Sequence, residues 1–213
     1  MPRQGHPPKG LNGRGKVMLA LRLSQPGNAN IPIYLATLGP HALEYTGAAA
    51  DGWLGTSFTP EHAAAHLDYL RRGAEGAGRS LADIDIQVGG TVAFGDDLDA
   101  LVEPLKPAMA FTLGAMGSAT TNFYNDAFKR GGWEAAGREV QRLWVAGKRP
   151  EAIAKVPSEM VLQANLLGDT EMVRNRIRTF RDAGVTTLRV APQGRDLAEK
   201  LATLGRVMDL VRG

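Results

Sequence analysis

IPIYLATLGPHALEYTGAAADGWLGTSFT, residues 31–59, is the stretch that decides the fold. It is typical of a strand, a tight turn, a helix, a second strand and a loop. Gly39 predicts a turn with an unusual backbone, and Pro40 suits the first helical position, where its missing N–H is not needed. A helix that starts directly after such a turn can bind an anion through its free N–H groups. We therefore expect a phosphate-bearing ligand near residues 37–40.

Length and composition limit the class of protein. The 213 residues fit one domain, and 44% hydrophobic residues are enough to form a core. The absence of cysteine excludes disulfides, thiolate metal sites and cysteine nucleophiles, and it is compatible with the cytoplasm. No apolar run approaches the length of a membrane span, and the N-terminus lacks the apolar segment of a signal peptide. We expect a soluble, cytoplasmic protein with no membrane partner.

The positive charge is concentrated at the N-terminus. The formal charge is +3, but residues 1–16 contain several basic residues and no acidic one, so the remainder is close to neutral. A protein that reads nucleic acid usually has a basic face with aromatic side chains on its folded part. That pattern is absent here, so we expect no nucleic-acid partner. We interpret residues 1–16 as a flexible basic leader.

Two motifs suggest other functions, but each lacks a required part. Residues 10–16, GLNGRGK, have the spacing of a phosphate-binding P-loop up to its lysine, but Val17 stands where Ser or Thr would bind magnesium. His62 and His66 lie four residues apart on a predicted helix, but a third metal ligand with suitable spacing is absent. Two surface imidazoles explain this pair equally well. We expect neither a nucleotide triphosphatase nor a metal site.

Strands and helices alternate at both ends of the remaining sequence. Apolar alternation predicts a strand within residues 84–94, and Asp169 or Thr170 predicts the N-cap of a helix that ends at Gly184. A strand at residues 185–191 and a final helix follow. Residues 98–157 contain no good strand and predict a helical insertion, which is either a lid or an oligomer interface. Alternating strands and helices predict a parallel sheet with functional loops after its strands.

Several blocks of the sequence resemble the bacterial-luciferase-like superfamily. The blocks are IPIYLATLGP, ADGWLG, FTLGAMG, NFYNDAF and DAGVTTLRV. Within this superfamily they are most similar to oxidoreductases that use the deazaflavin coenzyme F420, and the similarity covers nearly everything from Gly10 onward. The resemblance implies a (β/α)8 TIM barrel that transfers hydride between the coenzyme and a small organic substrate. FMN is the alternative cofactor, as in luciferase-like monooxygenases.

The resemblance also implies where the cofactor binds. The loop that matches Ala36, Thr37, Leu38 and Gly39 approaches the cofactor through its backbone in this family, and the position of Thr56 lies beside the cofactor or substrate. These residues include the turn for which we expect an anion. They are therefore the candidate cofactor contacts.

Other loop residues are candidates for substrate contacts. They are Ser57, Gln193 and Arg195, for which ordinary turn and capping roles are an alternative explanation. Relatives that act on sugar phosphates have a lysine at the position of Thr59, so a phosphorylated sugar is not favoured. No pair of carboxylates and no group containing histidine converges closely enough to name a catalytic acid or base.

The number of strands predicts a partial barrel. A complete barrel has eight βα units in about 250 residues, whereas four barrel strands are predicted here, and the resemblance aligns residues 17–213 with the C-terminal half of the family. We expect an α/β fold with about four βα units plus the helical insertion, incomplete as an enzyme. Open strand edges and an exposed apolar inner face predict a homo-oligomer or a complementary half-barrel chain. The alternatives are a non-catalytic half-barrel assembly module and a gene remnant without selected function.

Overall fold

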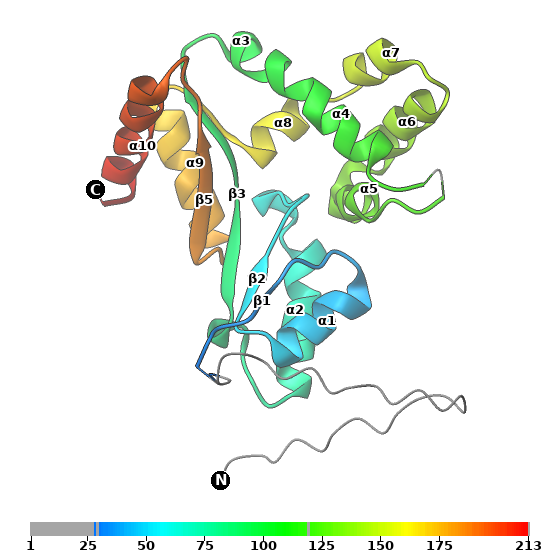
Figure 1. Ribbon diagram of the computed structural model, residues 1–213, viewed down its shortest axis with the longest axis vertical. Coiled ribbons are helices and arrows are strands. Elements are labelled where there is room, and N and C mark those ends of the chain that lie inside the picture. Colours follow the sequence, from blue (N-terminus) through cyan, green and yellow to red (C-terminus); the bar gives the residue numbers. More distant parts are fainter. Residues whose placement is uncertain (1–27, 29, 119, 213) are drawn as a thin grey trace, which may run out of the picture. The chain divides into compact units, whose positions relative to one another are not determined.

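A single parallel sheet organises the described part of the chain (Figure 1). The computed structural model describes Asn28 and residues 30–118 and 120–212, and their helices and strands lie within the unit Pro32–Gly213. The expected basic leader and the P-loop-like residues 10–16 lie outside the described residues. The sheet has five strands, and each of its pairings is parallel. The predicted α/β class, as a partial TIM barrel, is confirmed.

The strand β3, Asp85–Phe94, is the centre of the sheet. Its first residues pair with β2 and its last residues pair with β4, while β5 pairs along the opposite edge. The strand β1 pairs with β2. The other strands are β1 (Tyr34–Leu35), β2 (Gly52–Leu54), β4 (Leu166–Gly168) and β5 (Thr187–Pro192). Among the described residues, β1, β4 and β5 each keep one edge without a strand partner, as expected of an open barrel.

Helices connect successive strands and form a separate segment between β3 and β4. The helices beside the sheet are α1 (Pro40–Ala49), α2 (Ala64–Gly76), α9 (Thr170–Asp182) and α10 (Leu197–Arg212). The segment between β3 and β4 contains α3 (Leu98–Val102), α4 (Lys106–Ala115), α5 (Phe123–Phe128), α6 (Glu134–Val145), α7 (Arg149–Ala154) and α8 (Ser158–Ala164). Short helical turns are η1 (Pro60–His62), η2 (Leu81–Asp83), η3 (Glu103–Leu105) and the π-helical η4 (Lys129–Trp133). In the described part of the chain, no helix is long and apolar enough to cross a membrane.

Local sequence signals explain where several helices start and stop. Pro104 and Pro107 interrupt the first helix after β3, so that α3, η3 and α4 follow one another. Asp169 caps α9, because its carboxylate accepts a hydrogen bond from the backbone N–H of Met172 at 2.8 Å. Gly184 follows the end of α9 with a φ of 97°, which favours glycine. The predicted end of α9 at Gly184 is confirmed, and of the two predicted caps Asp169 is the one that caps the helix.

Separate apolar clusters hold the sheet and the helical segment. One cluster packs α1, α2 and α9 against β2 and β3, and it includes Leu43, Trp53, Leu70, Ile86 and Phe180. A second cluster lies among the helices α3 to α8 and includes Val102, Leu113, Val140 and Met160. Because the helical segment has its own buried core, it forms a packed layer beside the strands.

The face of the sheet that points away from α1 and α2 is polar near the start of the strands. The carboxylate of Asp85 accepts hydrogen bonds from the Tyr34 hydroxyl at 2.9 Å and from Gln87 Nε2 and Thr187 Oγ1, each at 2.8 Å, and also from Thr186 Oγ1. Burial tends to raise the pKa of Asp85, but these hydrogen bonds outweigh it and lower the pKa to about 2. The network joins β1 and β5 to β3. The expected apolar inner face is therefore wrong at these positions.

A glycine makes this network possible. A Cβ atom on Gly52 would lie 2.0 Å from Cε1 of Tyr34, so the tyrosine ring occupies the space that a side chain at this position would fill. The ring crosses β2 at Gly52 and brings its hydroxyl to Asp85 on the neighbouring strand. Glycine is therefore required at position 52 because the Tyr34 side chain packs across the strand there.

Candidate functional site

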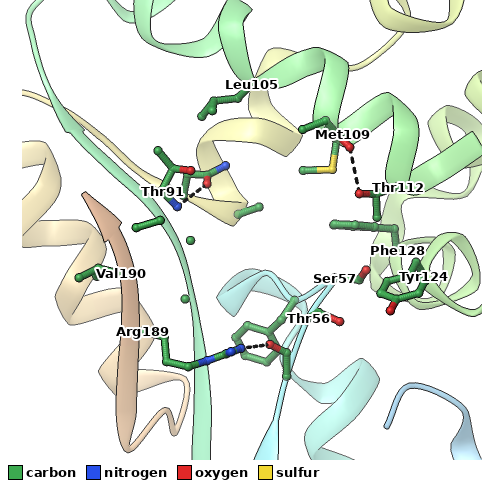
Figure 2. Close-up of a pocket in the computed structure, with 18 residues that line it drawn as sticks. Thr56, Ser57, Thr91, Leu105, Met109, Thr112, Tyr124, Phe128, Arg189 and Val190 are labelled. Carbon is green, nitrogen blue, oxygen red and sulfur yellow. Dashed lines mark hydrogen bonds between the residues drawn. The ribbon is translucent and has the colours of Figure 1, made fainter. Parts of the chain in front are cut away.

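A cavity of about 560 Å³ lies between the strands and the helical segment (Figure 2). One wall comes from residues 55–58 after β2, residues 89–91 of β3 and residues 189–191 of β5. The opposite wall comes mainly from η3, α4, α5 and α8. Active sites of (β/α)8 barrels lie at the C-terminal ends of the strands, and this volume suits a small organic molecule. The cavity is therefore the candidate active site.

Arg189 is the single charged residue among the described residues that line the cavity. Its Nη2 donates a hydrogen bond to the carbonyl of Gly55 at 2.8 Å, which links β5 to the end of β2. Leu188 and Val190 pack in the apolar cluster beside α9 and α10, so Arg189 lies on the opposite face of β5. Arg189 was not among the sequence candidates. A charged residue alternating with apolar residues inside a strand is the signal that would have indicated it.

Two of the predicted residues, Thr56 and Ser57, line the cavity directly after β2. Ser57 has a φ of 51°, a left-handed conformation that is unfavourable for a residue with a side chain. Its Oγ is buried and has no hydrogen-bond partner within the described part of the chain. Backbone strain and an unpaired buried hydroxyl together are typical of a position that binds a ligand.

The helical wall is mostly apolar and is attached to β3 through one amide. Leu105, Met109 and Phe128 face the cavity from this wall (Figure 2). Asn165 accepts a hydrogen bond from the backbone N–H of Thr91 at 2.8 Å, which ties the end of α8 to β3. The sequence candidates included none of these residues, because long-range packing brings them together. Among the described lining residues there is no carboxylate and no histidine, so no catalytic acid or base is assigned.

The predicted cofactor loop, residues 36–39, lies outside the cavity lining. Its carbonyl groups are held by neighbouring side chains: Trp53 Nε1 donates to Thr37 at 2.9 Å, and Arg130 Nη2 donates to Leu38 at 2.6 Å. Arg130 belongs to η4, which directly follows α5, and α5 contributes to the cavity wall. The loop and the cavity therefore contact the same helical segment.

Gly39 leaves the N-terminus of α1 without a side-chain cap. Its φ of −76° and ψ of 150° are ordinary extended values, so the expected unusual backbone is wrong. Pro40 occupies the start of the helix as predicted. In the described part of the chain, the N–H groups of Leu38 and Gly39 have no hydrogen-bond partner. An uncapped helix start beside the Arg130 guanidinium has the donors and the positive charge that an anion requires.

The two remaining loop candidates lie elsewhere. The Gln193 backbone N–H donates to the Val92 carbonyl at 2.9 Å, and the Gln193 carbonyl accepts from Thr203 Oγ1 at 2.9 Å. Arg195 forms an ion pair with Glu199 on α10, and its guanidinium is exposed. Neither residue lines the cavity. The structure thus brings Thr56 and Ser57 into the cavity and leaves Gln193 and Arg195 outside it.

The two histidines differ in their surroundings. His62 lies in η1, whereas His66 lies in α2 with its ring packed between Trp53 and Phe58, at centroid distances of 5.4 and 5.8 Å. His66 is fully buried, so the interpretation as two surface imidazoles is wrong for this residue. Burial, and to a smaller extent the nearby charge of Arg130, together lower the pKa of His66 to about 4. The described residues contain no cluster of potential metal ligands.

Comparison with known protein families identifies the family of this chain. A family model described as luciferase-like monooxygenase matches residues 9–187. The chain belongs to this family. The predicted resemblance to luciferase-like, F420-dependent oxidoreductases is confirmed by the family match and by the relatives' names.

Two curated relatives carry names that refer to oxidation–reduction chemistry. A Mycobacterium tuberculosis protein, provisionally named a coenzyme F420-dependent oxidoreductase, is 34% identical over 196 residues, which are 89% of this chain and 56% of the relative. The 5,10-methylenetetrahydromethanopterin reductase of Methanopyrus kandleri is 28% identical over 180 residues, 84% of this chain and 50% of the relative. The chain spans about half the length of these relatives.

A solved structure supports the same fold. The coenzyme F420-dependent tetrahydromethanopterin reductase from Methanopyrus kandleri superimposes with a TM-score of 0.59 at 23% identity. The match covers 82% of this chain and 48% of that chain. The similarity concerns the fold, and it agrees with the parallel strands of a partial barrel.

Proposed function

We propose that this chain supplies the cofactor loop and one side of the substrate cavity of an F420-dependent, luciferase-like oxidoreductase. The observation that carries the proposal is the uncapped N-terminus of α1 next to Arg130, at the end of a strand in a partial barrel of this family. The names of the relatives support coenzyme F420 as the cofactor. The chain spans about half the length of those relatives, so catalysis of a complete reaction by this chain is also part of the proposal.

The residues of the loop fit an anionic cofactor. The N–H groups of Leu38 and Gly39 and the first turn of α1 offer donors, and Arg130 offers a positive charge. Arg130 Nε is buried and has no partner among the described residues, so the guanidinium has unused donor capacity. We propose that Ala36, Thr37, Leu38 and Gly39 contact the cofactor mainly through the backbone, and that Thr56 lies beside it.

The protein groups bind and orient the reactants. When F420 is bound, its deazaflavin ring supplies the hydride donor or acceptor at C5. The helical wall contributes apolar side chains to the cavity, among them Leu105, Met109 and Phe128, which can contact the apolar part of a reactant. Ser57 offers an unpaired hydroxyl to a bound molecule. A small organic substrate in the cavity and a cytoplasmic location are parts of the same proposal.

A titration with two cofactors tests this function. The purified chain is titrated with F420 and with FMN while the fluorescence of the cofactor is followed. An unrelated protein that binds no flavin, in the same buffer, serves as the control. We expect saturable binding of F420 that exceeds the binding of FMN. A stronger, saturable response to FMN would replace F420 by the alternative cofactor, and the absence of saturable binding to either would refute the enzyme assignment.

The second candidate function is a non-catalytic half-barrel module that assembles with itself or with a complementary chain. The unpaired edges of β1, β4 and β5 favour it, because strand edges pair readily with other strands. Ile33 next to β1 is also an exposed large apolar side chain. Size-exclusion chromatography with light scattering tests assembly: we expect an oligomer, and a stable monomer at high concentration would count against this candidate.

A further inference from the structure

The cavity contains a cation without a counter-charge. Arg189 forms no ion pair within the described part of the chain, and its Nη2 makes one hydrogen bond, to Gly55. A guanidinium has five N–H donors in a planar arrangement. Most of its donors are therefore available to a molecule in the cavity. An anionic group is the partner that uses them best, because charge-assisted hydrogen bonds are stronger than neutral ones.

One hydrogen bond tethers the guanidinium of the exposed residue Arg189 before a ligand binds. Its contact with the Gly55 carbonyl spans from β5 to the end of β2, beneath the cavity in the view of Figure 2. A tethered arginine loses less conformational freedom on binding than a free one. Thr56 and Ser57 follow Gly55 and add hydroxyl groups to the same cavity. These features favour an oxyanion that accepts several hydrogen bonds.

The wall across the cavity from Arg189 is mostly apolar, and its polar residues are Thr112, Tyr124 and Asn165. Leu105 and Met109 lie on the far side of the cavity from the guanidinium (Figure 2), and Phe128 belongs to the same wall. No carboxylate among the described lining residues would repel an anion. The cavity therefore has one cationic side chain and a mostly apolar wall, which suits a ligand with a charged end and an apolar body.

We propose that this cavity takes an organic carboxylate, whose carboxylate group binds Arg189 and whose apolar body lies against α4. The inference rests on the proposed function, because it names the substrate class of the same site. A single cation matches a single negative charge, and the planar guanidinium matches a planar carboxylate. Arg189 is thus a specificity-determining residue of the cavity.

A pair of isosteric probes tests this inference. Hexanoate and hexanamide have the same chain length and differ in charge, and their binding to the purified chain is measured by ligand-observed NMR. The wild type is compared with Arg189→Gln, with Arg189→Lys and with Arg178→Gln. The last variant is the matched control: it removes the same charge from the outer surface of α9, where Arg178 contacts Asn175 at 3.2 Å. Circular dichroism reports whether each variant is folded.

We expect hexanoate to bind the wild type about tenfold more tightly than hexanamide, which corresponds to one net charge-assisted hydrogen bond. Arg189→Gln is expected to abolish this difference, Arg189→Lys to retain part of it, and Arg178→Gln to leave it unchanged. Equal affinities of the two probes for the wild type, or no binding of either, would overturn the inference. So would an unchanged preference in folded Arg189→Gln.

Salt provides a test that needs no variant. The preference of the wild type for hexanoate should shrink as ionic strength rises, whereas hexanamide affinity should stay constant. A salt-independent preference would contradict a charge interaction. The F420 titration is run on the same samples: loss of F420 binding with a retained carboxylate preference would refute the proposed function alone, and the reverse result would refute the carboxylate site alone.

Discussion

The buried imidazole of His66 should make the stability of the chain depend on pH in a mildly acidic range. Its pKa is about 4 in the folded chain, compared with an ordinary value of 6.5. Between these values the unfolded chain binds a proton that the folded chain does not bind. The free energy of unfolding is therefore fully maintained above pH 6.5, falls as the pH is lowered, and stops responding to this group below about pH 4.

The size of this effect follows from the two pKa values. Each unit of difference corresponds to about 1.4 kcal/mol, so His66 should remove about 3 kcal/mol of stability across this range. Neither nitrogen of its ring has a hydrogen-bond partner among the described residues, so no local acceptor stabilises the protonated form. Arg130 is the charged group that acts on this ring, and it opposes protonation.

Urea unfolding at a series of pH values between 7.5 and 4.5 measures the effect. The His66→Leu variant should lose most of the pH slope while keeping similar stability at pH 7.5, because it replaces an unpaired polar ring by an apolar side chain. His41→Gln is the matched control, since it removes an imidazole whose side chain is fully exposed, and its pH slope is compared with that of His66→Leu. Parallel stability curves for the wild type and His66→Leu would refute the reasoning.

Two further substitutions test the polar network across the sheet. Gly52→Ala should destabilise the fold by about 1 to 3 kcal/mol in urea unfolding, because the new Cβ would lie 2.0 Å from the Tyr34 ring; unchanged stability would contradict this contact. Asp85→Asn should lower stability at pH 7 by about 1 kcal/mol after allowance for partial solvent screening, because the amide cannot accept all four hydrogen bonds. The pKa of the Asp85 carboxylate is lowered, so its contribution to the free energy of unfolding should be complete above its ordinary pKa and disappear as the pH falls through about 2. An equal loss of stability in acid for the wild type and Asp85→Asn would contradict this expectation.

The strands in which apolar and polar residues alternate clearly could be predicted from the sequence. Another strand, β4, depends on pairing with β3 in the folded chain. β3 and β5 follow from apolar residues at every second position. β4 was missed because its three residues, Leu166–Gly168, carry no periodic signal and are extended through pairing with the end of β3. The polar inner face was also missed, since Asp85 and Tyr34 are far apart in sequence and meet only across strands.

In the candidate site too, local features could be predicted from the sequence and long-range contacts could not. Thr56 and Ser57 could be located because a loop after a strand is a local feature, and both line the cavity. Gly39 was read as a backbone requirement, but its structural consequence is a helix start without a capping side chain. The alternation of Arg189 with Leu188 and Val190 is a local signal, but the absence of a counter-charge beside it among the described lining residues is a property of the folded cavity. The expected roles of Gln193 and Arg195 stay predictions.

The most direct test of the central claim is F420 binding to two variants of Gly39. A Cβ at this position would approach only the Phe123 ring, at 4.0 Å, and the backbone is ordinary, so both Gly39→Ala and Gly39→Asp should fold. Asp should cap α1 with a negative charge and occupy the N–H groups that an anionic cofactor needs. We predict saturable F420 binding by the wild type, similar affinity for Gly39→Ala, and about tenfold weaker binding for Gly39→Asp. Equal F420 affinities of Gly39→Asp and Gly39→Ala would contradict cofactor binding at the start of α1.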